Sequence, residues 1–444
     1  MQNTSFLLKI KHLSFLICIA ACLQACGTHQ MMAKKIDRVF KHSDILKQYH
    51  VGFALYDLSK EHMIFQKDAN IYYTPASNTK LFTYYAGLKI AADSIPSLRY
   101  VEQGDSLIFW GTGDPSFLHT VLKGTKAFDF LKNNDKKLFF SPGRYTGSFY
   151  ANGWQWDDYN EYYQPEINEL PLFDNVLLFR TAANTAVQIM PPSFTSKLLK
   201  DSSLNSKSFR VIREYDQNVF HLPSTKTPAT YRQQIPYKTS TATTLSLLTD
   251  TLHRAIGLSN LKMPSNAKTI FNLNSDSVFK QMLLPSDNFV AEQLLLTYAD
   301  RLGIELNTSK VISYVEKEYL SSLPDKPVWA DGSGLSRSNL FTPRSMVALL
   351  ELIYKEVNNE QKLFSMLPAG GKSGTLRTAY PQTNNPFVFG KTGSLSNNHN
   401  QSGFVKTKKN KVYIFSFMNN SFVMPTAEVR KEMVRIMTYI HNNF

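Results

Sequence analysis

Cysteine is missing from almost the whole chain. Its three cysteines, Cys18, Cys22 and Cys26, lie within the first 26 residues. A chain that starts at Cys26 after processing therefore has no disulfide and no cysteine nucleophile. Three other signatures are absent: Gly-x-Ser-x-Gly, His-Glu-x-x-His and the paired Cys/His spacings of zinc sites. These absences exclude the hydrolase and metalloprotease classes that depend on them.

Dense basic clusters and long apolar runs are also lacking. The 444 residues carry a net charge of +14, but no segment gathers Lys and Arg as a nucleic-acid site does. We therefore expect weak attraction to anionic surfaces and no nucleic-acid partner. The apolar run 13–23 is too short to span a bilayer. With 43% hydrophobic and 13% aromatic residues, the chain can form large cores.

The N-terminus reads as a targeting segment. Basic residues precede the apolar run, which ends in Leu23-Gln24-Ala25-Cys26-Gly27. This pattern resembles a bacterial lipobox, so we expect residues 1–26 to be a lipoprotein signal peptide with the lipid on Cys26. Cys22 fits the same pattern after Ile19-Ala20-Ala21, and a plain secretory signal is the remaining alternative.

A nucleophile motif occurs at Thr74-Pro75-Ala76-Ser77-Asn78-Thr79-Lys80. Thr74 is a good N-cap and Pro75 suits the first helical position, so a helix is expected to start here. Ser77 and Lys80 then share a helix face, and a desolvated amine can take the hydroxyl proton. Alone, Ser-x-x-Lys is a weak motif.

A second motif is Ser286-Asp287-Asn288, at a loop-to-helix junction. A second hydroxyl can relay a proton to a leaving amine, and an amide can hold both a lysine and a substrate carbonyl. The alternative is that this motif is only a helix N-cap without a catalytic role, since Ser and Asp are favoured at N-cap positions.

The third motif, Lys391-Thr392-Gly393-Ser394, follows the alternating apolar run Phe387-Val388-Phe389 and is therefore placed on a strand. Lys supplies a positive charge, Thr a donor for a carboxylate, and Gly lets a substrate backbone lie along the strand edge. Lys372-Ser373-Gly374 is similar but lacks the strand, so it ranks well below Lys391.

The order Ser-x-x-Lys, Ser-x-Asn, Lys-Thr-Gly, each in a fitting context, is a specific combination. With the long separation between Ser77 and Ser286, the chain resembles the low-molecular-mass class C penicillin-binding proteins, a D-Ala-D-Ala carboxypeptidase/endopeptidase family. Further segments that carry the resemblance are 111–115, 153–158, 286–292 and 331–337.

The resemblance implies an α+β fold of the penicillin-binding-protein/β-lactamase type, with a five-stranded antiparallel sheet and a large, mainly β insert. We expect a catalytic domain from 27–96 and 263–444, and an inserted module of one or two small domains at 97–262. The expected elements are a hairpin at 51–58 and 63–67, strands near 387–393, 401–406 and 412–418, and helices at 34–48, 77–92, 342–355 and 427–441.

The resemblance also implies acyl transfer. Ser77 attacks the carbonyl between two D-Ala residues of a stem peptide, Lys80 takes its proton, and Ser286 protonates the leaving D-Ala. Backbone N–H groups of Ser77 and Ser394 form the oxyanion hole. The remaining implied site residues hold Lys80, the terminal carboxylate or the stem peptide: Asn288, Lys391, Thr392, Gly393, Ser394, Trp154, Asp157, Arg337 and Leu395.

The expected function is a serine D-Ala-D-Ala carboxypeptidase, a DD-endopeptidase, or both, inhibited by penicillins and without cofactor or metal. The alternatives are a β-lactamase or esterase on the same scaffold, and a non-catalytic wall-binding lipoprotein. The expected partners are peptidoglycan stem peptides, β-lactams and a lipid anchor, with no protein partner implied. We expect the chain in a bacterial cell envelope, facing the periplasm, at the outer rather than the inner membrane.

Overall fold

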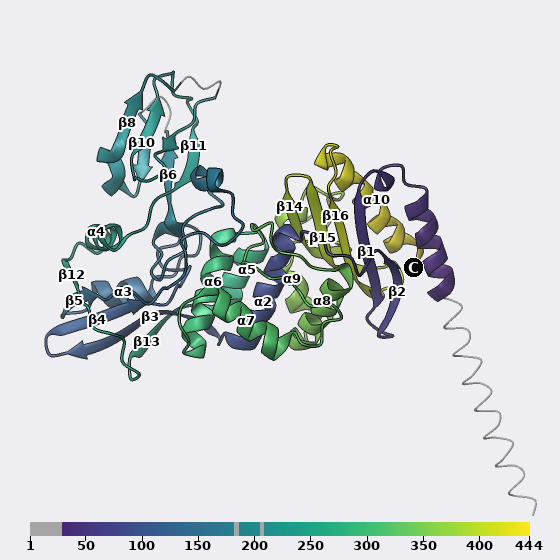
Figure 1. Ribbon diagram of the computed structural model, residues 1–444, viewed down its shortest axis with the longest axis horizontal. Helices are drawn as coiled ribbons and strands as arrows, with labels where there is room; N and C mark the ends of the chain where they lie inside the picture. Colours follow the sequence, from purple (N-terminus) through teal and green to yellow (C-terminus); the bar gives the residue numbers. More distant parts are fainter. Residues whose placement is uncertain (1–28, 182–185, 205–207) are drawn as a thin grey trace, which may run out of the picture.

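The computed structural model describes residues 29–181, 186–204 and 208–444, and it places two β-rich regions on either side of a layer of helices (Figure 1). The predicted lipidation sites Cys22 and Cys26 lie outside the described residues. Among the described residues, no helix is long and apolar enough to cross a membrane.

The predicted five-stranded antiparallel sheet is confirmed. Its strand order is β14-β15-β16-β1-β2, so residues from both ends of the chain share one sheet. The strands are β14 (Val388–Leu395), β15 (Asn398–Lys406), β16 (Val412–Asn420), β1 (His50–Asp57) and β2 (His62–Lys67). Alternate residues of β16 point to opposite faces: Phe415 and Phe417 join one core, and Ile414 and Met418 the other.

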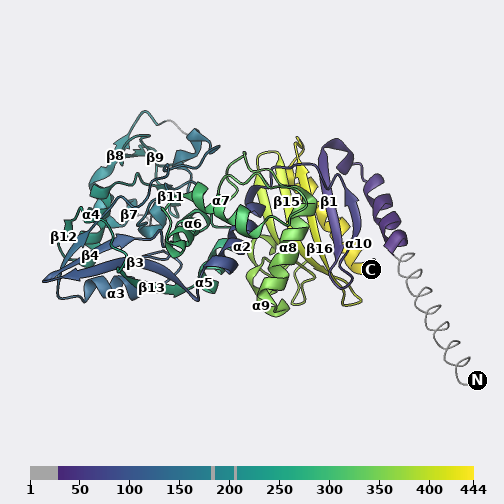
Figure 2. The same cartoon turned by 60° about the horizontal axis from the view of Figure 1, so that its bottom comes forward.

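Helices cover both faces of this sheet. One face packs against α8, behind which lie α2 and α6, while the other packs against α10 and the helical residues 29–41 (Figures 1 and 2). The helices are α2 (Lys80–Ile90), α5 (Ser275–Leu283), α6 (Asn288–Leu302), α7 (Thr308–Tyr319), α8 (Pro343–Val357), α9 (Glu360–Met366) and α10 (Thr426–Asn443). The expected helix 34–48 instead ends near residue 41, and a short 3-10 turn follows, η1 (Leu46–Gln48).

The region between α2 and α5 is mainly β, and it holds three small sheets around a core of its own. The first is β12-β5-β4-β3-β13, the second β11-β6-β7 and the third β8-β10-β9. Their strands are β3 (Ser94–Gln103), β4 (Ser106–Gly111), β5 (Lys137–Phe140), β6 (Val176–Arg180), β7 (Gln188–Met190), β8 (Leu198–Asp201), β9 (Ile212–Arg213), β10 (Phe220–Pro223), β11 (Arg232–Pro236), β12 (Ile256–Leu258) and β13 (Lys268–Asn274). Two helices accompany them, α3 (Lys126–Lys132) and α4 (Thr241–Leu252).

Candidate active site

Ser77 lies in a 3-10 turn, η2 (Ala76–Thr79), that runs directly into α2. The expectation that Thr74 caps this helix is wrong, because the turn begins after Pro75 and has no side-chain cap. The backbone N–H of Thr74 instead donates to Asn420 Oδ1 of β16 at 2.7 Å. The turn is thus fixed by the neighbouring sheet, and Ala76, just before Ser77, has a left-handed φ of 50°.

Lys80 is fully buried, and its Nζ lies 3.0 Å from Ser77 Oγ. The same nitrogen donates to Asn288 Oδ1 at 2.7 Å and to the carbonyl of Ser333 at 2.7 Å. Burial lowers the pKa of Lys80 to about 8, against the opposing charges of Asp331, Glu292 and Asp287. The site therefore contains a lysine that loses its proton far more readily than an exposed one.

The start of α6 brings Ser286 and Asn288 to this lysine. Asp287 caps the helix by accepting from the N–H of Val290 at 3.1 Å. The N-cap is therefore Asp287 itself, and neither Ser286 nor Asn288 has that role. Ser286 has a left-handed φ of 67°, a conformation that costs free energy in a non-glycine residue. Asn288 donates through Nδ2 to the carbonyl of Tyr163, which fixes its Oδ1 towards Lys80.

Lys391 approaches from the sheet side. Its Nζ donates to Ser286 Oγ at 2.8 Å and to the carbonyl of Thr392 at 2.7 Å. Burial, and then the nearby charge of Lys80, hold the pKa of Lys391 well below its ordinary value. Three segments far apart in sequence, η2, the start of α6 and β14, thus join their polar groups in one cluster.

β14 is an edge strand, and its Gly393 lies against the turn that carries Ser77. A Cβ at Gly393 would come 2.4 Å from the carbonyl of Pro75 and 2.9 Å from the N of Ser77. Only a residue without a side chain permits this approach. The backbone of β14 therefore runs beside Ser77, as the predicted substrate-binding edge requires.

The other residues of this strand have their own contacts. Thr392 Oγ1 lies 2.6 Å from Thr375 Oγ1, and Ser394 Oγ lies 2.7 Å from His399 Nδ1. Burial, with Arg430 and Lys391 adding, lowers the pKa of His399 to about 4, so this ring is neutral at neutral pH. Leu395 is half-buried at the end of β14.

The structure also brings residues of the β-rich insert to the same place. Trp154 donates through Nε1 to Asp331 Oδ2 at 2.9 Å. Arg337 donates to Gln155 Oε1 at 3.4 Å and to the carbonyl of Ser396 at 3.5 Å, linking three loops. Asp157 is exposed in the 3-10 turn η3 (Trp156–Asn160).

Sequence reasoning gave no role to Glu292 and the carbonyl of Ser333. Glu292 is buried one helical turn after Asn288, and it accepts from the N–H groups of Gly332 and Ser333 at 3.0 and 2.8 Å. It thereby fixes the carbonyl that accepts from Lys80. Burial, with the charge of Asp331 adding, raises the pKa of Glu292 to about 8. The spacing of four from Asn288 is the sequence feature that could have indicated it.

Two segments that resemble catalytic motifs have other contacts: Lys372-Ser373-Gly374, and Glu166-Ile167-Asn168-Glu169-Leu170, which faintly resembles the Glu-x-x-Leu-Asn loop of class A β-lactamases but has Pro171 in place of the Asn. Glu166 is buried and paired with Lys238 Nζ at 3.0 Å, and it also accepts from the N–H and hydroxyl of Thr239. Lys372 is exposed and donates to the carbonyl of Asn384 at 3.2 Å.

Comparison with known proteins gives a consistent result. The D-Ala-D-Ala carboxypeptidase 3 (S13) family matches residues 32–440. The D-alanyl-D-alanine carboxypeptidase DacB of Haemophilus influenzae is 25% identical over 448 residues, covering 88% of this chain and 90% of that protein. Penicillin-sensitive carboxypeptidase A of Dictyostelium discoideum is 24% identical over 410 residues, covering 79% and 78%.

Among solved structures, penicillin-binding protein 4 (dacB) of Haemophilus influenzae has the same fold. It matches with a TM-score of 0.72 and 18% identity over 92% of this chain and 99% of that one. Its complex with a β-lactam matches with a TM-score of 0.69 and 17% identity over the same shares. The expected fold type is therefore confirmed.

Proposed function

This chain belongs to the D-Ala-D-Ala carboxypeptidase 3 (S13) family, and from this premise we propose that Ser77 is the nucleophile through which it acts. The protein is a serine-type D-Ala-D-Ala carboxypeptidase and/or DD-endopeptidase of peptidoglycan stem peptides, and penicillins inhibit it. The observation that carries the assignment of Ser77 is its contact with a buried lysine of lowered pKa.

The partners of Lys80 account for its role as the base. A neutral amine has two N–H groups and one lone pair. Asn288 Oδ1 and the carbonyl of Ser333 can only accept hydrogen bonds, so they take both N–H groups. The lone pair is then left facing Ser77 Oγ, which donates its proton as the oxygen attacks the carbonyl carbon.

The leaving group needs a proton. Ser286 donates its hydroxyl proton to the nitrogen of the departing D-Ala as the C–N bond breaks, and the proton that Lys80 took from Ser77 replaces it, while Lys391 donates a hydrogen bond to the Ser286 oxygen. Water then attacks the ester on Ser77, its proton passes through Lys80 to Ser77 Oγ as the ester C–O bond breaks, and the shortened peptide is released. Negative charge that develops on the carbonyl oxygen is stabilised by the N–H groups of Ser77 and Ser394.

The remaining site residues position the substrate. Lys391, Thr392 and Ser394 bind the terminal carboxylate, while Gly393 lets the peptide lie along the free edge of β14. Trp154, Asp157, Arg337 and Leu395 contact the stem-peptide side chain. The contacts of Trp154 with Asp331, and of Arg337 with Gln155 and the carbonyl of Ser396, support this assignment, because they link the insert to the loop that follows β14.

Penicillin labelling tests the nucleophile. Intact-mass measurement and peptide mapping should find one adduct, on Ser77, and Ser77→Ala should carry none. An adduct that persists in Ser77→Ala would show that the assignment is wrong.

Lysine-to-arginine changes test the separate roles. Lys80→Arg should nearly abolish acylation, because a guanidinium does not deprotonate in proteins. Lys391→Arg keeps a cation and should mainly raise KM. Equal losses of acylation rate in the two variants would contradict this division.

The alternative of a β-lactamase needs a dedicated base for deacylation. Glu166, the one residue whose surroundings faintly resemble such a base, is occupied by Lys238 and Thr239 within the insert. Rapid turnover of a chromogenic cephalosporin would favour this alternative, and absence of any penicillin label would favour a non-catalytic wall-binding protein. Digestion of cross-linked muropeptides separates endopeptidase from carboxypeptidase, since one releases monomers and the other free D-Ala.

We also propose a lipid-anchored location in a bacterial envelope, with the site facing the periplasm at the outer membrane. The lipobox-like pattern at Cys26 supports it. Two or three acyl chains hold a protein stably on a membrane, whereas one does not. The mature protein should enter the detergent phase, and N-terminal mass analysis should find lipid on Cys26. An unmodified N-terminus would refute the lipid anchor. A mature chain that starts at Cys22 would move the lipidation site from Cys26 to Cys22.

The division of the chain remains our proposal: a catalytic domain from 27–96 and 263–444, and an insert at 97–262. The separate core of the insert supports it. Strand pairing favours slightly wider limits, since β3 starts at Ser94 and β13, its partner, ends at Asn274.

A further inference from the structure

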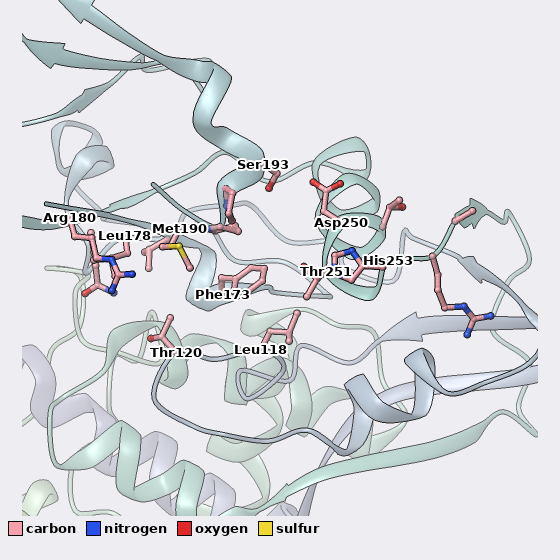
Figure 3. A pocket seen from close by; sticks show the side chains of 17 residues that line it. Leu118, Thr120, Phe173, Leu178, Arg180, Met190, Ser193, Asp250, Thr251 and His253 are labelled. Carbon is pink, nitrogen blue, oxygen red and sulfur yellow. The ribbon is translucent and has the colours of Figure 1, made fainter. Parts of the chain in front are cut away.

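A cavity of about 1100 Å³ lies within the insert, between β6, β7, the end of α4 and the loop at 118–120 (Figure 3). None of the site residues described above lines it. Its walls are mostly apolar, and its volume is close to the upper end for small-molecule sites. The apolar lining includes Leu118, Phe173, Val176, Leu178, Met190 and Pro191.

The charges at the cavity favour an anion at one end. Arg180 lines it and has no hydrogen-bond or ion-pair partner for its guanidinium among the residues that the structure describes. Arg232 is not among the lining residues, but it lies directly opposite Arg180 in the pairing of β11 with β6, so both side chains leave the same face of the sheet. Two like charges placed opposite each other repel, and an anion between them would relieve this repulsion. Asp250 lies farther along the cavity (Figure 3). Arg254 also lines it, but its guanidinium donates to the carbonyls of Leu131, Lys132, Asn134 and Lys136, so Arg180 is the lining arginine that sets the direction of a bound anion.

Part of the cavity wall has an unusual backbone. Leu118 has a φ of 56°, and Phe173, Asp174 and Asn175 have φ values of 52°, 59° and 52°. Each such non-glycine conformation is strained, and these conformations cluster at ligand clamps and switch regions. Leu118 and Phe173 line the cavity directly.

His119 and Asp174 directly follow Leu118 and Phe173, and they lie towards the motif Ser286-Asp287-Asn288. Asp174 accepts from the N–H of Thr120 at 3.1 Å and so ties the two loops together. His119 accepts through Nδ1 from the N–H groups of Val121 and Leu122, both at 3.0 Å. Its Nε2 therefore carries the hydrogen, and it points at Asp287 Oδ2 at 3.9 Å without a hydrogen-bond partner among the described residues.

Asp287 is the residue between Ser286 and Asn288. The loop 118–120 thus lies between the cavity and the start of α6, and a shift of about 1 Å would close the His119–Asp287 gap to a hydrogen bond. A ligand in the cavity, in contact with Leu118, occupies the space into which the loop 118–120 could otherwise move away from Asp287.

We propose that the cavity binds an amphiphilic anion, with its apolar body against Phe173 and Met190 and its anionic group between Arg180 and Arg232. Occupancy holds His119 against Asp287, the cap of α6, which fixes the neighbouring Ser286 and Asn288 beside Lys391 and Lys80 and thereby speeds the acylation of Ser77. The binding stands on the cavity alone, whereas the effect on acylation rests on the function proposed above.

Binding is tested by isothermal titration calorimetry with laurate below its micelle-forming concentration. One saturable site is expected, at least tenfold weaker in Arg180→Ala and blocked when Met190→Trp fills the cavity. Lys200→Ala, which removes an exposed cation of β8 outside the cavity, is the matched control and should bind as the wild type does. No saturable binding, or binding indifferent to both cavity variants, overturns the proposal.

The relay is tested by the rate of penicillin acylation with and without saturating laurate. An increase of about fivefold is expected, at the lower end of typical couplings between sites. His119→Asn keeps an acceptor for the N–H groups of Val121 and Leu122 but lacks Nε2, so it should bind laurate normally and lose the acceleration. An unchanged rate in the wild type, or full acceleration in His119→Asn, overturns the relay. Failure of the proposed function is seen separately, as absence of acylation in the ligand-free protein.

Discussion

The amine of Lys80 is directed by two groups that can only accept hydrogen bonds, and one of them depends on Glu292. Without that buried carboxylate, the N–H groups of Gly332 and Ser333 would lose their acceptor and the carbonyl of Ser333 its fixed position. Glu292 also acts at a distance: when it is ionised, above its own raised pKa of about 8, its charge raises the pKa of Lys80 against the effect of burial. A residue outside the three motifs therefore controls both the orientation and the basicity of the base.

The pH dependence of acylation should report this. Lys80 is a base only when neutral, so the rate of penicillin acylation should rise with pH and level off above about pH 8. Glu292→Gln removes a group whose ionised form, present as the pH passes about 8, raises the pKa of Lys80, so its curve should shift to lower pH. Its plateau should also fall, since an amide oxygen replaces only part of what the carboxylate accepts. A stopped-flow rate profile checks both effects, and a curve with an unmoved midpoint would contradict the electrostatic role.

At the scale of elements, the site depends on how closely β14 passes the turn that carries Ser77. Gly393 is in contact with the backbone of this turn, while Gly390, three residues earlier, is in contact with β15. The two glycines are therefore a natural comparison within one strand.

Gly393→Ala should reduce acylation by at least tenfold, since its Cβ would push β14 away from the N of Ser77. Gly390→Ala would meet the carbonyl of Ser402 at 2.7 Å, so it should cost stability without a specific effect on acylation. The measurement is the acylation rate of each folded variant beside its urea midpoint. Similar rate losses in both variants would show that the close approach has no special role.

At the scale of the whole molecule, α6 is the helix to which the insert is bound by hydrogen bonds and ion pairs. Gln293 donates to the carbonyls of Gly113 and Asn168 at 3.1 and 2.8 Å. Farther along, the fully buried carboxylate of Asp300 pairs with Arg99 and Arg144, each at 2.8 Å. The helix that begins with Asn288 therefore also aligns the insert with the proposed catalytic residues.

Asp300→Asn should destabilise the protein by about 3 kcal/mol, because it leaves two largely buried guanidinium groups without their counter-charge. Asp276→Asn breaks the exposed pair with Lys362 and should cost less than about 1 kcal/mol. Urea unfolding of both variants gives the comparison. Equal and small losses would mean that the insert is held by its apolar contacts alone.

The sequence alone determined the local features of this protein. The β1–β2 hairpin, strands β14 to β16 and helices α8 and α10 follow from alternation, helical periodicity and turn residues, whose causes lie within a few positions. The motifs at Ser77, Ser286 and Lys391 were visible for the same reason, since each is a short run of residues with a fitting local context.

Only the tertiary structure decided how these parts meet. Lys80 and Asn288 are 208 positions apart, and their contact depends on the whole path of the chain between them. The N-cap expected at Thr74 is not formed, because the turn begins only after Pro75 and has no side-chain cap, while the backbone of Thr74 is hydrogen-bonded to Asn420 of β16. The close approach of Gly393 to the turn of Ser77 and the position of His119 opposite Asp287 are contacts between elements, and no local pattern encodes them. Side-chain chemistry can thus be read from the sequence, whereas distance, burial and the pKa shifts that follow from them belong to the folded chain.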